Sequence, residues 1–273
     1  MRREHSPPPH LLLTDPQGVL PGAVIGGRWR VTGLLGRGAM ATVFEVVDLG
    51  APHEETDAPP PAAAANGVFA LKLLSATQVR DAFKRFEREA RLACTIVHPN
   101  VVRTHAFGTW AGRPFLTMER LIGETLGQRL APGRAPLPMN EALEVGSDIA
   151  AGLAAVHALG ISHRDLSPGN VFLVQGGPAR VMDFGSARLP RDPMGVSSGR
   201  LVLGTPSCLA PERVLGEDPG SSAGDVWSLG VLLYRMIAGV DPFRASNPLA
   251  LMQRIVRAPA EPLSLLRDEL PRG

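Results

Sequence analysis

The chain has 273 residues, a formal net charge of +2, and 44% hydrophobic but only 5% aromatic residues. This length allows one or two domains with a full-sized core. So small a charge, spread along the chain, argues against a nucleic-acid or membrane-surface partner. Cys94 and Cys208 match no metal-ligand spacing and imply no disulfide framework. No stretch has the pattern of a signal peptide or a membrane span, so we expect a cytoplasmic protein.

The first half of the chain predicts strands separated by low-complexity segments. Residues 1–22 are proline-rich and aperiodic, which is typical of a flexible tail. Residues 29–48 hold two strand-like runs around a glycine-rich centre and predict a β-hairpin. Residues 49–67 are rich in alanine and proline and predict a disordered insertion. The stretches VFALKLL (68–74) and GRPFLTMERL (112–121) predict further strands.

Helical patterns dominate the second half, after one helix in the first. The segment 81–97 is amphipathic, and its expected apolar face consists of Phe83, Phe86, Ala90, Ala93 and Val97. Further helices are expected at 139–160, at 225–239, which is apolar nearly all round, and at 247–258. Strands followed by helices predict an α+β fold of two lobes, 23–122 and 123–273, with the boundary near Gly123.

Two polar segments of the second half are expected to converge. HRDLSPGN (163–170) ends in Asn170, and DFG begins with Asp183. The apolar runs between them flank Gln-Gly-Gly-Pro, which predicts a hairpin. If its turn is centred between Gly176 and Gly177, Asn170 lies across from Asp183. An amide and a carboxylate offer oxygen ligands only, which suits Mg²⁺. Taken singly, DFG is more often a plain turn and Asn170 more often a helix cap.

A lysine and a glutamate form a second candidate pair. Lys72 is one of two lysines against 26 arginines, and it lies inside an apolar strand pattern. Glu89 borders the apolar stripe of the helix at 81–97, where a carboxylate is costly unless it meets a cation. The alternatives are a surface lysine kept by chance and a glutamate that pairs with a neighbouring arginine.

The glycine-rich segment LGRGAMATV supplies a third feature. Gly36 and Gly38 would let backbone N–H groups approach an anion without a Cβ in the way. The ordinary explanation is a hairpin turn that requires positive φ. The segment returns into a strand, which argues against a dinucleotide-binding site, because that arrangement opens a helix.

Seven segments in this order resemble the protein kinases, most closely the Ser/Thr kinases of bacteria. They are LGRGAMATV, FALK, the glutamate of FEREA, HRDLSPGN, DFG, GTPSCLAPE and DVWSLG. The resemblance runs from about Trp29 to the end of the chain. It implies ATP and Mg²⁺ (or Mn²⁺) as cofactors and protein Ser/Thr hydroxyls as acceptors. It further implies that the site residues meet around one triphosphate.

The resemblance also assigns roles to individual residues. Asp165 would accept the proton of the substrate hydroxyl, Asn170 and Asp183 would hold the metal, and Lys72 and Glu89 would form the pair that holds the phosphates. The positions expected to bind the nucleotide are Leu35, Gly36, Arg37, Gly38, Val43, Ala70, Lys72, Glu89, Met118, Glu119, Leu121 and Phe172. His163 and Phe184 would form an internal spine that stands on Asp225.

Regulation is expected through the loop between DFG and APE. Arg164 would pair with a phosphate on that loop, and Ser197 and Ser198 are candidate autophosphorylation sites or simply two serines of a flexible loop. Such autophosphorylation would bring two copies together. Thr205 could hydrogen-bond Asp165.

Two departures from the family pattern stand out. Ser167 replaces a lysine that reaches the γ-phosphate in many Ser/Thr kinases. The chain also stops before the family's last helices, and the missing arginine would leave Glu212 without its partner. We expect either a fragment or a truly short chain. An active Ser/Thr kinase is the leading hypothesis; the alternatives are a pseudokinase or scaffold and a small-molecule phosphotransferase, against which GTPSCLAPE argues.

Overall fold

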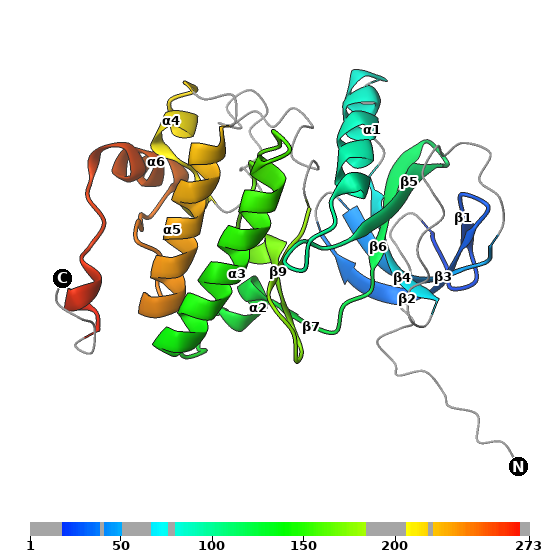
Figure 1. Cartoon of the computed structure of the whole chain (residues 1–273). Helices are drawn as coiled ribbons and strands as arrows, with labels where there is room; N and C mark the ends of the chain where they lie inside the picture. Colours follow the sequence, from blue (N-terminus) through cyan, green and yellow to red (C-terminus); the bar gives the residue numbers. More distant parts are fainter. Residues whose placement is uncertain are drawn as a thin grey trace, which may run out of the picture. The chain divides into compact units, whose positions relative to one another are not determined.

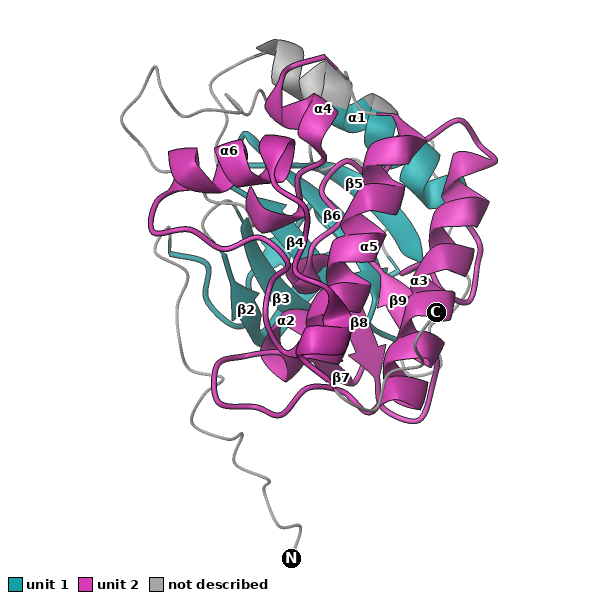
Figure 2. Cartoon of the chain, turned by 90° about the vertical axis from the view of Figure 1, so that its left-hand side faces the viewer, with its two compact units in different colours: residues 1–96, 103–121 teal, residues 97–102, 122–273 magenta. Residues whose placement is uncertain are grey.

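The computed structural model describes residues 18–38, 41–50, 67–75, 80–183, 206–217 and 221–267. Most of the expected tail and insertion lies outside these ranges. The chain divides into two compact units, one of residues 1–96 and 103–121, the other of residues 97–102 and 122–273 (Figure 2). The first unit holds strands and one helix, whereas the second holds most of the helices, so the predicted α+β class is confirmed.

A six-stranded sheet forms the first unit, with the order β1-β2-β3-β4-β6-β5 and antiparallel neighbours throughout (Figure 1). The hairpin and the later strands predicted from the sequence are present. The strands are β1 (Val24–Ile25), β2 (Trp29–Arg37), β3 (Ala41–Asp48), β4 (Val68–Leu74), β5 (Thr104–Trp110) and β6 (Arg113–Glu119).

Residues of alternating parity on these strands separate the sheet into two unlike faces. One face carries large apolar side chains that are almost completely buried, among them Trp29, Phe44, Phe69, Leu71 and Phe115. Trp29 and Phe69 meet edge to face with ring centroids 5.2 Å apart. This face is therefore the core of the first unit, and the opposite face is left for helix packing and for a site.

The helix α1 (Arg80–Thr95) packs against β5 and β6 through the stripe that the sequence predicts. Phe86, Ala90 and Ala93 are buried, whereas the side chain of Phe83 lies outside the described part. The prediction for Val97 is wrong, because α1 ends at Thr95 and Val97 is 76% exposed. Ile96, 4% exposed, takes the inward position instead.

Helices α3 and α5 pack along each other in the second unit (Figure 1). Gly146 allows their close approach, because a Cβ there would lie 2.4 Å from the side chain of Leu233. The α5 helix ends at Gly239, which has the left-handed φ of 74° that favours glycine. The remaining elements of the unit are β7 (Gly123–Thr125), α2 (Leu126–Arg129), α3 (Met139–His157), η2 (Pro168–Asn170), β8 (Val171–Val174), β9 (Arg180–Val181), η4 (Pro206–Cys208), α4 (Pro211–Val214), α5 (Ser222–Ala238), α6 (Pro248–Arg257) and η5 (Leu263–Leu265).

None of the helices in the described ranges has both the length and the apolar character needed to cross a membrane.

The register of the β8–β9 hairpin differs by one residue from the prediction. Val171 pairs with Val181, and the N–H of Met182 donates to the carbonyl of Asn170 at 2.9 Å. Asn170 therefore lies opposite Met182, and Asp183 follows one position further on. The cause is a turn centred on Gly176, which has φ of 71°, and not between Gly176 and Gly177.

Candidate active site

In the first unit, several of the predicted nucleotide-binding residues share the face of the sheet that is not closed by the core. Lys72 pairs with Val43 on one side and with Leu116 on the other, and Ala70 pairs with Met118. Residues directly opposite one another, or two apart on one strand, point to the same side. Val43, Ala70 and Met118 therefore form an apolar surface with the ammonium of Lys72 beside it, a combination suited to a flat base and a phosphate.

The same face carries α1. Phe86 and Ala90 of α1 pack in one cluster with Leu74 and Leu116, which project from the same side of the sheet as Lys72. Lys72 and Glu89 are both half-buried. The fold thus brings the helix with Glu89 to the side of the sheet on which Lys72 lies, while the ion pair itself stays a prediction.

The glycines of the β2–β3 hairpin are not required by the fold. Neither Gly36 nor Gly38 has a positive φ, so the ordinary explanation by turn conformation does not hold for them. A Cβ at Gly36 would meet no atom within 4 Å, and one at Gly38 would meet only the carbonyl of Ala41 at 3.6 Å. Open space beside a backbone that glycine keeps bare fits a ligand that approaches closely.

At the end of β6, Glu119 is held by Arg103. The N–H of Arg103 donates to Glu119 Oε1 at 2.7 Å, and the N–H of Glu119 donates to the Arg103 carbonyl at 3.0 Å. Next along the chain, the guanidinium of Arg120 donates to the Leu121 carbonyl. The carboxylate of Glu119 is therefore committed to the fold, in agreement with the expectation that this segment would act through its backbone.

In the second unit, Asp225 at the start of α5 fixes the catalytic loop. Its side chain is 1% exposed, and its oxygens accept the N–H of His163 at 2.7 Å and the N–H of Arg164 at 2.8 Å. His157 Nε2 lies 2.8 Å from Asp225 Oδ2. Arg164 has φ of 67°, a conformation that costs on the order of 1–3 kcal/mol for a residue with a side chain. The buried carboxylate offsets that cost and holds the loop in one shape.

His163 is fully buried and ties the catalytic loop to the segment before DFG. Its Nδ1 accepts the N–H of Asp165 at 3.3 Å, so Nε2 carries the proton and donates to the Met182 carbonyl at 2.9 Å. Burial lowers the pKa of His163, although the Asp225 carboxylate partly opposes this effect. The imidazole is therefore neutral and structural, as expected.

Asp165 and Asn170 are in direct contact. Asn170 Nδ2 donates to the Asp165 carbonyl at 2.8 Å and to Asp165 Oδ2 at 3.3 Å. The amide oxygen of Asn170 makes no hydrogen bond with the described residues, so it is the atom free to bind a hard cation. Asp183 follows Met182 with a strained φ of 67°. The donor set fits Mg²⁺, since it offers amide and carboxylate oxygens.

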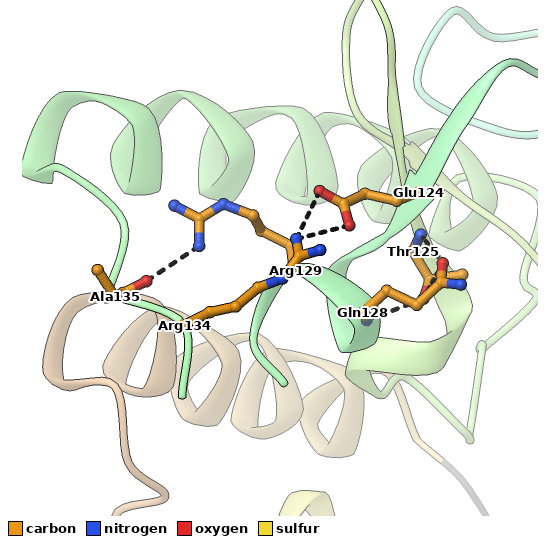
Figure 3. A network of polar contacts seen from close by, with 6 residues as sticks. All are labelled: Glu124, Thr125, Gln128, Arg129, Arg134 and Ala135. Atoms are coloured by element: carbon orange, nitrogen blue, oxygen red, sulfur yellow. Dashed lines mark hydrogen bonds and ion pairs between the residues drawn. The ribbon is translucent and has the colours of Figure 1, made fainter. Parts of the chain in front are cut away.

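A short helix below the loop is fixed by a polar network that our sequence interpretation missed (Figure 3). Thr125 and Gln128 form a capping box at α2, recognisable in the sequence as T-x-x-Q. Arg134 pairs with Glu124 at 2.8 Å, and Arg129 donates to the Ala135 carbonyl at 2.9 Å. The α2 helix packs against η2, the turn between Asp165 and Asn170, and so supports the catalytic loop from beneath.

Several predicted site residues lie outside the described part of the chain, namely Phe184, Ser197, Ser198 and Thr205. Others are placed but not tested for their roles. Ser167 is 9% exposed, and Phe172 lies on β8 opposite Thr125. Glu212 has no hydrogen bond or ion pair with the described residues.

Comparison with known proteins identifies the family. Residues 29–269 match the family model described as "Protein kinase domain". The chain therefore belongs to the protein kinase family.

Relatives in bacteria extend this similarity over most of the chain. The chain is 39% identical to the serine/threonine-protein kinase pkn2 of Myxococcus xanthus over 89% of its length. It is 32% identical to PknA of Mycobacterium tuberculosis, again over 89%. It spans 28% of the length of pkn2 and 54% of PknA. The crystal structure of the PknI kinase domain of M. tuberculosis superposes with a TM-score of 0.68 and 26% identity, covering 93% of this chain and 86% of that one.

Proposed function

We propose that the chain is a serine/threonine protein kinase that transfers the γ-phosphate of ATP to a protein hydroxyl. The observation that carries this proposal is the closed geometry of the catalytic loop, in which Asp225 fixes the backbone around Arg164 while Asn170 holds Asp165. Family membership and the names of the relatives support the same reaction.

Each side chain has a role in this proposal. Asp165 orients the acceptor hydroxyl and accepts its proton, the part that an aspartate at this position plays in protein kinases. Lys72 holds the phosphates, and the apolar face around Ala70 binds the base. Asn170 and Asp183 would hold Mg²⁺, which supplies charge neutralisation at the phosphates when bound.

Ser167 is expected to reduce the rate without abolishing it. A lost charge-assisted hydrogen bond costs about 1.5–3 kcal/mol. If this is lost wholly in the transition state, the rate falls by about one to two decades. The alternative, a nucleotide-binding scaffold, would show binding without transfer.

The test is transfer of labelled phosphate from ATP with Mg²⁺ to a Ser/Thr-containing protein. We expect transfer by the wild type and a loss of at least about a hundredfold in Asp165→Asn, Asp183→Ala and Lys72→Met. Asp241→Asn, which changes a half-buried carboxylate paired with Arg235 at 3.2 Å, is the matched control. Equal incorporation by all five proteins would refute the catalytic roles.

A further inference from the structure

We propose that Arg213 is a specificity-determining residue that selects substrates with an anionic side chain close to the phosphorylated hydroxyl. This inference rests on the proposed kinase function and names a feature of the substrate that this function leaves open. Arg213 lies on α4, directly after Glu212. Its guanidinium Nη1 donates to the carbonyl of Arg164, the residue that precedes Asp165. A positive charge is thereby placed one residue from the group that receives the acceptor hydroxyl.

The anchor of this charge is rigid. The Arg164 backbone is held by the 2.8 Å bond from its N–H to the buried Asp225. The segment before α4 is fixed as well, because Ser228 Oγ of α5 donates to the Cys208 carbonyl at 2.8 Å. A cation held in place before binding loses little conformational entropy when it meets an anion, so its contact contributes more fully to affinity.

The charge of Arg213 is not neutralised within the described part of the chain. Its side chain makes the single bond to Arg164, and it has no ion pair with the described residues. The adjacent Glu212 also makes none. A guanidinium has five N–H donors in a planar fork that matches carboxylate and phosphate. With one nitrogen committed to a carbonyl, the others can receive an oxygen anion.

The catalytic loop itself presents no acid toward a basic substrate other than Asp165. Ser167 and Gly169 are the residues that follow on the same turn, and both are uncharged. A lysine or arginine in the substrate would therefore meet Arg213 without compensation, whereas aspartate or phosphoserine would pair with it. The shared chemistry is an oxygen anion on the substrate.

The experiment compares peptides that hold one serine and that carry aspartate, phosphoserine, alanine or lysine at each flanking position. We expect kcat/KM to be about tenfold higher for an anionic peptide than for the alanine peptide, the effect of one charge-assisted contact. Arg213→Ala should remove this preference, Arg213→Lys should keep part of it, and Arg213→Glu should shift it toward lysine. Arg257→Ala, an exposed charge deletion on α6, is the matched control and should keep it.

Peptide binding to Asp165→Asn, measured by fluorescence anisotropy, separates this inference from the proposed function. If no peptide is phosphorylated but anionic peptides bind in an Arg213-dependent manner, the kinase proposal fails and the inference holds. Absence of any anionic preference, or a preference that survives Arg213→Ala, overturns the inference. Aspartate and phosphoserine peptides show which anion is favoured.

Discussion

The replacement Asp225→Asn tests whether one buried carboxylate holds the catalytic loop. Asp225 Oδ1 accepts the N–H of Arg164, whereas Oδ2 accepts the N–H of His163 and contacts His157 Nε2. Asparagine has the same shape but only one oxygen. Its less costly orientation keeps that oxygen at the Oδ2 position and turns the NH₂ group toward the N–H of Arg164.

The cost follows from these contacts. Leaving the buried N–H of Arg164 without an acceptor costs about 1–3 kcal/mol. The bonds that remain become neutral, and each loses roughly 0.5–1 kcal/mol of its charge-assisted strength. The total is about 3 kcal/mol, a large part of the 5–15 kcal/mol that is typical of a folded domain.

Equilibrium urea unfolding of the two proteins measures this difference. Asp241→Asn is the control, because its partly exposed pair with Arg235 should contribute less than about 1 kcal/mol. Should Asp225→Asn unfold within 1 kcal/mol of the wild type, the carboxylate would not be what fixes the loop.

Three further substitutions test other parts of the structure. Because burial lowers the pKa of His163, the unfolded chain takes up a proton below about pH 6.5 that the folded chain refuses, so stability falls with decreasing pH by up to about 1.4 kcal/mol per unit. His163→Phe should flatten this slope between pH 7 and 5 in urea titrations, and an unchanged slope would exclude His163 as its source. Gly123→Ala should lower the free energy of unfolding by more than about 2 kcal/mol, since φ is 147° and the new Cβ would lie 2.0 Å from the Leu173 carbonyl; Gly230→Ala on α5, where the space is open, should instead stabilise by about 0.5–1 kcal/mol. Gly36→Ala should leave stability within about 0.5 kcal/mol but raise the KM for ATP several-fold, and an unchanged KM would contradict a ligand at that position.

Much of the fold was predictable because its signals are local. The apolar periodicity of Phe86, Ala90 and Ala93 predicted the buried stripe of α1. The same periodicity failed at Val97, because it does not show where a helix ends. Here the end is followed by His98 and Pro99, and a residue before proline disfavours helix.

The site was predictable in its residues but less so in its geometry. The hairpin between Asn170 and Asp183 was predicted, yet its register was one residue off, because a turn with several glycines does not specify its own centre. The contact of Arg213 with Arg164 joins positions far apart in the chain, and no local pattern indicates it. Long-range contacts of this kind become visible only when the backbone is placed.

The central claim is that Asp165 serves the chemical step and not nucleotide binding. The most direct measurement determines, for wild type and Asp165→Asn, both the Kd for Mg²⁺-ATP and the rate of phosphate transfer. We predict equal Kd values and a rate that is lower by about two to four decades in the variant. A wild type that binds ATP but transfers no phosphate, or a variant that transfers at the wild-type rate, would contradict the account.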